Sequence, residues 1–174
     1  MKQLLLLAAF VAVWGTALAQ SKTIKNFYDK YKGLEEVTDL KLQGWMIRLA
    51  ARSTEDVEEQ KLLKKITHLR ILSMENGNLV SPQEHSQLVQ SVKKEAFESL
   101  LQIRDQGQYV EFFIREKGNT ITDLLLLISG AEQFVLISLE GNLDFSDLQH
   151  LHIDTTGGEH FRKIPKEKKQ IPRA

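Results

Sequence analysis

The sequence has no cysteine among its 174 residues and only 3 prolines. The absence of cysteine excludes a disulfide scaffold, a thiolate metal site and a cysteine nucleophile. Basic and acidic residues are equally frequent, with 23 of each, so the excess of positive charge that is typical of nucleic-acid-binding proteins is missing. The remaining composition, with 42% hydrophobic residues, is that of a globular protein able to bury a core.

The first residues show the three parts of a secretory signal: the basic Lys2, an apolar run from Leu4 to Trp14, and the small-residue motif Ala17-Leu18-Ala19. The run is much shorter than the ~20 apolar residues that a membrane-spanning helix needs. We therefore predict a signal peptide over residues 1–19, cleaved after Ala19, rather than a retained membrane anchor. The mature protein is expected in the periplasm or outside the cell, without a membrane span and without a cysteine for lipid attachment.

Apolar residues recur at helical spacing in several segments. The segment 45–52 is typical, because Met46, Leu49 and Ala50 share one face of the expected helix. Another begins with Ser81, Pro82 and Glu84, which together form a capping box with proline in the first turn. The predicted helices span residues 21–32, 45–52, 54–65, 81–92, 96–103 and 144–151.

Alternating apolar and polar residues predict strands at 37–42, 66–76, 109–115, 120–128 and 134–139. The last three are separated by short turns and form an antiparallel meander. Residues 124–128 are apolar on both faces of their strand, which is typical of a central strand that is covered on both sides. The sequence therefore predicts a single α+β domain over residues 20–154, with a mainly antiparallel sheet of about five strands and packed helices.

The end of the chain, residues 155–174, is polar and basic. From Gly157 onward there are six basic and two acidic residues, which leaves the body of the mature chain acidic. We predict that this tail is disordered. Its lysines Lys166, Lys168 and Lys169 provide at most a weak contact to anionic lipid, and a solubilising role is the favoured interpretation.

The export signal, WMIRLAAR, ITHLRILSMEN and, above all, YVEFFIREKGNTITDLLLLISGAEQFVLISLEGNLDFSDLQHL resemble the bacterial domain-of-unknown-function 4252 family. The resemblance extends from Ser21 to Leu151. It implies an exported envelope protein of Gram-negative bacteria with no assigned activity, and it supplies no catalytic residues. Some members resemble lipoproteins, and this chain departs from them because it lacks cysteine.

One group of residues has the composition of a metal site. His150, His152 and Asp154 alternate along the chain, and Glu159 and His160 follow closely. Imidazoles two residues apart in an extended chain can point the same way and bind zinc or copper. Because the group lies where the last helix meets the predicted tail, a polar helix end is the favoured interpretation, and no metal ligand is assigned.

A second group consists of charged residues on the meander. Glu111 and Asp123 are expected to face one another across the hairpin, and paired carboxylates can act as general acid and base. Arg115 and Lys117 are close enough in sequence to neutralise them. A solvated strand surface with cross-strand charge pairs is the favoured interpretation, so no catalytic or cofactor-binding residue is assigned.

A third group, Trp45, Met46, Phe97, Phe112 and Phe113, either lines a pocket for an apolar ligand or belongs to the core, and the core is favoured.

These patterns predict a non-enzymatic envelope protein that binds another macromolecule, an unknown envelope protein and not a nucleic acid, without a cofactor. The alternative is a carrier of an apolar small molecule in a pocket between sheet and helices, and a hydrolase of unfamiliar type ranks last.

Overall fold

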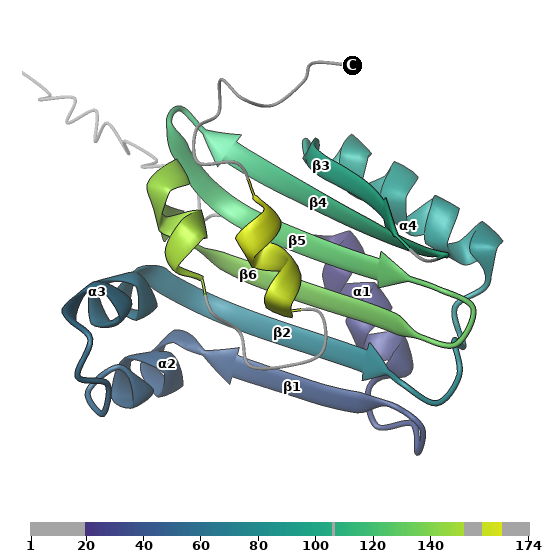
Figure 1. Cartoon of the computed structure of the whole chain (residues 1–174), viewed down its shortest axis with the longest axis horizontal. Coiled ribbons are helices and arrows are strands. Elements are labelled where there is room, and N and C mark those ends of the chain that lie inside the picture. Colours follow the sequence, from purple (N-terminus) through teal and green to yellow (C-terminus); the bar gives the residue numbers. More distant parts are fainter. Residues whose placement is uncertain (1–19, 106, 152–157, 165–174) are drawn as a thin grey trace, which may run out of the picture.

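The computed structural model describes residues 20–105, 107–151 and 158–164 (Figure 1). The α-helices are α1 (Lys22–Tyr31), α2 (Gly44–Ala50), α3 (Val57–Lys65) and α4 (Pro82–Lys94). The strands are β1 (Thr38–Gln43), β2 (Ile66–Met74), β3 (Glu98–Asp105), β4 (Gln108–Lys117), β5 (Thr120–Ser129) and β6 (Phe134–Leu143). Two 3-10 helices follow, η1 (Phe145–His150) and η2 (Gly158–Lys163).

All six strands form one antiparallel sheet in the order β1-β2-β6-β5-β4-β3 (Figure 1). The predicted meander is confirmed in β4, β5 and β6, and the predicted α+β class is confirmed as well. β2 pairs with β6, which brings the first half of the chain onto the edge of the meander. The sheet has six strands, one more than the sequence predicted.

The additional strand is β3, where we predicted a helix. The helix α4 ends at Lys94, and Ala96 then takes a left-handed backbone conformation with a φ of 64°, which turns the chain into the strand. The pairing of β3 with β4 shifts between Ser99 and Leu101, as in a β-bulge. Because of the turn and the bulge, the apolar residues Phe97, Leu100 and Leu101 do not alternate with polar residues as in a regular strand. Their spacing of three and four residues is that of a helix, although the chain is extended here.

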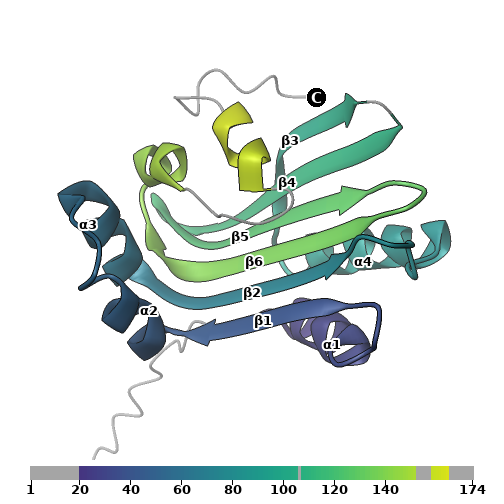
Figure 2. The ribbon, with the colours of Figure 1, turned by 60° about the horizontal axis from the view of Figure 1, so that its bottom comes forward.

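The two faces of the sheet are covered by different elements. Figure 2 shows α1 and α4 on one side of the sheet and η1 and η2 on the other. Because strand residues alternate between faces, the apolar meander supplies both cores. The α1–α4 side includes Ile24, Tyr28, Leu88, Val92, Phe113, Leu125 and Phe134. The other side includes Leu62, Phe112, Leu126, Ile137, Leu148 and Phe161.

Part of the predicted disordered tail is ordered. The 3-10 helix η2 places Phe161 against the sheet, where its side chain is buried and its ring lies edge-on to Phe112 at 5.5 Å between centroids. The prediction of disorder is therefore wrong for residues 158–164. The tail is rich in charged residues, and this composition favoured a prediction of disorder although the segment contains one aromatic residue, Phe161, that can anchor it. The other tail residues, 155–157 and 165–174, lie outside the described residues.

The predicted signal peptide, residues 1–19, also lies outside the described residues. Among the helices that the structure describes, none is long and apolar enough to cross a membrane.

Gly141 on β6 is a position where only glycine fits. A Cβ atom there would lie 2.5 Å from the carbonyl oxygen of Lys65 and 3.2 Å from the Cα of Ile66, both backbone atoms. We expect Gly141→Ala to lower the free energy of unfolding by about 1–3 kcal/mol, because the backbone must move to relieve the clash. Urea unfolding measures this, with Gly130→Ala as the control, because its Cβ would lie 3.3 Å from the flexible side chain of Gln108 and no closer than 3.9 Å to the backbone oxygen of Gln133. Equal stability of both variants would contradict the prediction.

Candidate binding sites

A pocket of about 530 Å³ lies between the beginning of α4 and one end of β4 and β5. We call it the α4 pocket. Its walls come from three segments. The first is Asn78 and residues 80–82 with His85, the second is Tyr109 and Glu111 of β4 with the preceding Gly107, and the third is residues 129–131 at the end of β5. The volume falls within the range of sites that bind small molecules.

The loop that forms one wall is fixed by its own side chains. The amide nitrogen of Asn78 donates to the carbonyl oxygen of Gly130 at 2.7 Å, and its oxygen accepts from the backbone N–H of Val80 at 2.8 Å. Ser81 then caps α4 by accepting a hydrogen bond from the N–H of Glu84, as the capping box predicted. The wall of the pocket is therefore held to both the end of β5 and the first turn of α4.

A histidine and a glutamate meet in the α4 pocket. The Nε2 atom of His85 lies 3.0 Å from Oε2 of Glu111, and their side chains are only 18% and 13% exposed. The other Glu111 oxygen accepts from the amide of Gln102 at 3.0 Å. The imidazole is oriented by Phe134, whose ring lies edge-on to it at 6.4 Å. Neither His85 Nε2 nor Glu111 Oε2 makes a well-directed hydrogen bond, although both atoms are buried.

The sequence analysis did not identify this pair, although a signal for it was present. His85 precedes Leu88 and Val92 by three and seven residues, which places it on the buried face of α4. Glu111 precedes Phe113 by two residues and therefore lies on the same face of β4. A polar residue at a core-facing position in each of two elements was the available signal.

The carboxylates Glu111 and Asp123 are not opposite one another, so the predicted pairing is wrong. Glu111 faces Leu127 on β5, whereas Asp123 faces Arg115 on β4. The hairpin pairs Lys117 with Thr120, and counting back along both strands from this pair already places Glu111 opposite a residue at least three positions from Asp123. The predicted charge pairing is confirmed for Arg115, which binds Asp123 through Nε and Nη2, both at 2.8 Å. The predicted solvated surface is wrong at this pair, because Asp123 is buried. Lys117 lies further along, opposite Thr120.

Asp123 belongs to a buried row of charged residues that crosses the sheet on the α1–α4 side. Its cross-strand neighbour on β6 is Glu140, which accepts a hydrogen bond of 2.6 Å from Nη1 of Arg70. The Nδ1 atom of His68 lies 3.2 Å from the second Glu140 oxygen. Each carboxylate is thus engaged by an arginine, which neutralises the charges that the fold buries.

The beginning of α1 is held close to the end of α4 by Glu95. Its carboxylate accepts from the N–H of Thr23 at 2.9 Å and from the hydroxyl of Thr23 at 2.6 Å. Burial by itself raises the pKa of Glu95, but the hydrogen bonds from Ser21 and Thr23 outweigh it and lower the pKa below its usual value. The carboxylate is therefore stabilised in its charged form between the two helices.

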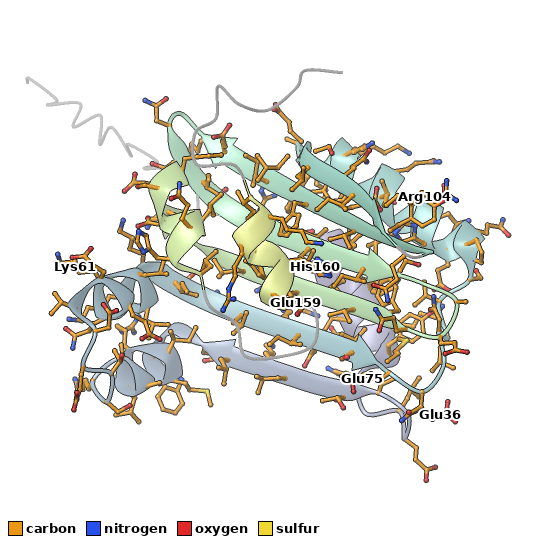
Figure 3. The ribbon with its side chains drawn as sticks, in the orientation of Figure 1. Glu36, Lys61, Glu75, Arg104, Glu159 and His160 are labelled. Atoms are coloured by element: carbon orange, nitrogen blue, oxygen red, sulfur yellow. The ribbon has the colours of Figure 1, made fainter. Side chains whose placement is uncertain are left out.

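The group of residues with the composition of a metal site lies only partly within the described residues. Figure 3 shows Glu159 and His160 on η2, where His160 is largely buried and its Nε2 lies 3.4 Å from Oε1 of Glu159. His152 and Asp154 lie outside the described residues. Within the described residues, no three His, Asp or Glu side chains converge on a point that could hold a metal ion.

The predicted apolar group does not line one pocket. Phe112 belongs to the core on the η1–η2 side, and Phe97 and Phe113 belong to the core on the α1–α4 side. These three phenylalanines therefore belong to the core, which was the favoured interpretation. Trp45 on α2 is 59% exposed, and Met46 beside it is half-buried.

The helix α2 presents the opposite face from the one that we predicted to be buried. Gly44, Ile47 and Ala51 face inward, whereas Leu49 is 58% exposed and lies one turn after Trp45. The cause is the close approach of Gly44 to β2, since a Cβ atom there would lie 3.1 Å from the carbonyl oxygen of Thr67. This contact turns two large apolar side chains of α2 toward solvent.

The strand β1 precedes α2 directly and forms one edge of the sheet. Its residues are exposed on both faces except for the half-buried Leu42, and Leu40 is 42% exposed. Leu40 also borders an apolar cleft of about 250 Å³ that is lined by α3, β2, Leu139 of β6 and the end of η1 with Leu151. We define the β1–α2 surface as Leu40, Lys41, Leu42, Trp45 and Leu49.

Comparison with known proteins gives a single finding. No curated protein and no solved structure matches the chain. A family model described as a domain of unknown function (DUF4252) matches residues 31–151, which include all six strands. The chain therefore belongs to the DUF4252 family, in agreement with the resemblance of its meander.

Proposed function

We propose that the chain is an exported, non-enzymatic envelope protein that binds another macromolecule through the β1–α2 surface. The observation that carries the proposal is the pair of large apolar side chains, Trp45 and Leu49, exposed beside an open sheet edge. Aromatic residues such as tryptophan are enriched at the centres of protein interfaces. Export is supported by the signal-like residues 1–19, and it places the partner in the periplasm or outside the cell.

The edge of β1 supports a partner segment in extended conformation. β1 pairs with β2 along its whole length, and within the described residues no strand lies along its other side. An added strand would satisfy the outward backbone groups of β1, a common mode of peptide recognition. Because neighbouring strands are about 4.8 Å apart, its alternate side chains would lie next to Leu40 and cover the mouth of the apolar cleft.

The charge distribution is consistent with a protein partner. Residues 20–156 carry a net negative charge and residues 157–174 a net positive one, so the body of the chain lacks the excess of positive charge that is typical of nucleic-acid-binding proteins. On the β1–α2 surface itself Lys41 is the charged residue, among four apolar side chains. We therefore commit to an extended segment of another envelope protein as the occupant.

A cross-linking experiment in living cells tests this proposal. A photo-reactive amino acid at Leu40 or Trp45 is expected to capture one protein, and the same probe at Gln90, an exposed residue of α4, is not. The captured segment is then synthesised, and its affinity for the purified protein is measured. We expect Trp45→Ala with Leu49→Ala to weaken binding about 10-fold or more, since truncating an interface tryptophan typically removes at least ~2 kcal/mol.

The matched control is Leu34→Ala with Leu79→Ala, which truncates two other leucines of similar exposure. Equal loss of affinity in both double variants would contradict the proposal. Capture of a second copy of this chain would replace the envelope partner by a homodimer, and capture of lipid alone would favour the carrier alternative.

A further inference from the structure

We infer that the α4 pocket binds a small organic amine, whose ammonium group contacts Glu111 and whose apolar body lies against Val80, Pro82 and Tyr109. This inference is independent of partner binding at the β1–α2 surface, because the two sites share no residue. It also differs from the apolar-carrier alternative, because it requires a charged group on the ligand.

The charges in the pocket favour a cation. Glu111 is the only acidic residue among the described residues that line it, and His85 is the only basic one. The buried Oε2 atom of Glu111 makes no well-directed hydrogen bond, although His85 Nε2 lies 3.0 Å from it, and a carboxylate oxygen can accept two hydrogen bonds. An ammonium group carries three donors and no acceptor, which matches the remaining acceptor capacity of this oxygen.

Two other polar side chains of the pocket are already engaged and do not favour an anion. The Asn78 amide is already engaged with Gly130 and Val80, and the Ser81 hydroxyl caps α4. A carboxylate ligand would place a second negative charge beside Glu111, which is costly in a partly buried site. A purely apolar ligand would bury Glu111 further without supplying a hydrogen bond, which is also unfavourable.

The walls of the pocket suit a compact ligand with an aromatic or aliphatic body. Val80, Pro82 and Ala131 supply aliphatic surface, and Tyr109 supplies an aromatic ring that is 46% exposed. The guanidinium of Arg104 on β3, labelled in Figure 3, lies 4.8 Å from the centre of this ring. Because this positive charge repels a cation at Tyr109, the ammonium group belongs at Glu111 and the apolar body at Tyr109.

Three probes with the same aromatic body distinguish these possibilities. Phenethylamine, 2-phenylethanol and 3-phenylpropanoate are titrated into the ¹⁵N-labelled protein as processed by the cell, and amide shifts are followed by NMR. We expect saturable shifts of Val80, His85, Tyr109 and Gly130 with the amine, weaker binding of the alcohol, and no saturation with the carboxylate. Glu111→Gln is expected to raise the Kd of the amine about 10-fold or more, because it removes the negative charge that the ammonium group contacts.

The matched control is Glu84→Gln, which removes a carboxylate on the first turn of α4 that bonds Lys30 and Tyr31 outside the pocket. Its amine affinity should be unchanged. A second variant, Ala131→Phe, fills the pocket from an exposed turn and should abolish binding even if Glu111→Gln fails to fold. The inference is overturned if the carboxylate binds more tightly than the amine, if all three probes bind equally, if none binds, or if Glu111→Gln folds and keeps its affinity.

Discussion

Replacing Arg70 by methionine is expected to lower the free energy of unfolding by about 3–5 kcal/mol, because it leaves a buried carboxylate without its counter-charge. Arg70 is 1% exposed and its Nη1 lies 2.6 Å from Glu140 Oε1. The cross-strand neighbour of Glu140 is another carboxylate, Asp123, so the repulsion between them would no longer be offset on the Glu140 side. His68 is 37% exposed and contacts the other Glu140 oxygen, so it compensates only weakly.

Urea unfolding of Arg70→Met, of Glu140→Leu and of the double variant separates the charge effect from packing. Both single variants should lose several kcal/mol, and the double variant should recover most of the loss, because an apolar pair of similar volume can replace a buried ion pair. The control is Lys61→Met, which breaks an exposed pair with Glu58 on α3 and should cost less than about 1 kcal/mol (Figure 3). If Arg70→Met is no more damaging than Lys61→Met, the buried pair does not stabilise the fold.

The parts of the fold that the sequence predicted correctly are those with continuous patterns. Residues 124–128 are apolar without interruption, and β5 is indeed central and covered on both faces. The capping box at Ser81 marked the start of α4 correctly. The helix predicted at 96–103 was wrong because a left-handed residue at Ala96 and a β-bulge gave an extended segment a helical spacing of apolar residues.

The candidate sites depend on contacts that periodicity does not encode. The solvent-facing side of α2 is set by the approach of Gly44 to Thr67, which is distant in sequence, and this contact exposes Leu49 rather than Ile47. The register of β4 and β5 separates Glu111 from Asp123. His85 and Glu111 meet only because α4 covers the face of the sheet on which Glu111 lies. Predicting either site therefore requires knowledge of how the helices and strands pack against one another, and the positions of these elements along the chain are not enough.

Truncating Phe161 to alanine is expected to lower the free energy of unfolding by about 3 kcal/mol, near the lower end for a buried phenylalanine. Phe161 is 1% exposed, and its ring lies edge-on to Phe112 at 78° between planes. The lower end applies because η2 is only six residues long and is not part of the sheet, so it can detach without unfolding the strands. Because η2 can detach, the decrease in the free energy of unfolding cannot exceed the free energy with which η2 docks on the sheet.

Trypsin digestion shows whether η2 detaches. Arg162 and Lys163 beside Phe161 are exposed but lie in an ordered 3-10 helix, which protects the backbone from cleavage. In Phe161→Ala we expect faster cleavage at these two residues, while β4, β5 and β6 stay intact. Lys163→Ala, which removes one exposed cleavage site and keeps the aromatic anchor, should leave cleavage at Arg162 slow. If Phe161→Ala is as stable and as resistant as the unchanged protein, η2 does not cover this side of the sheet in solution, and Phe112 and Leu126 would require another cover, because apolar strands rarely remain open to water.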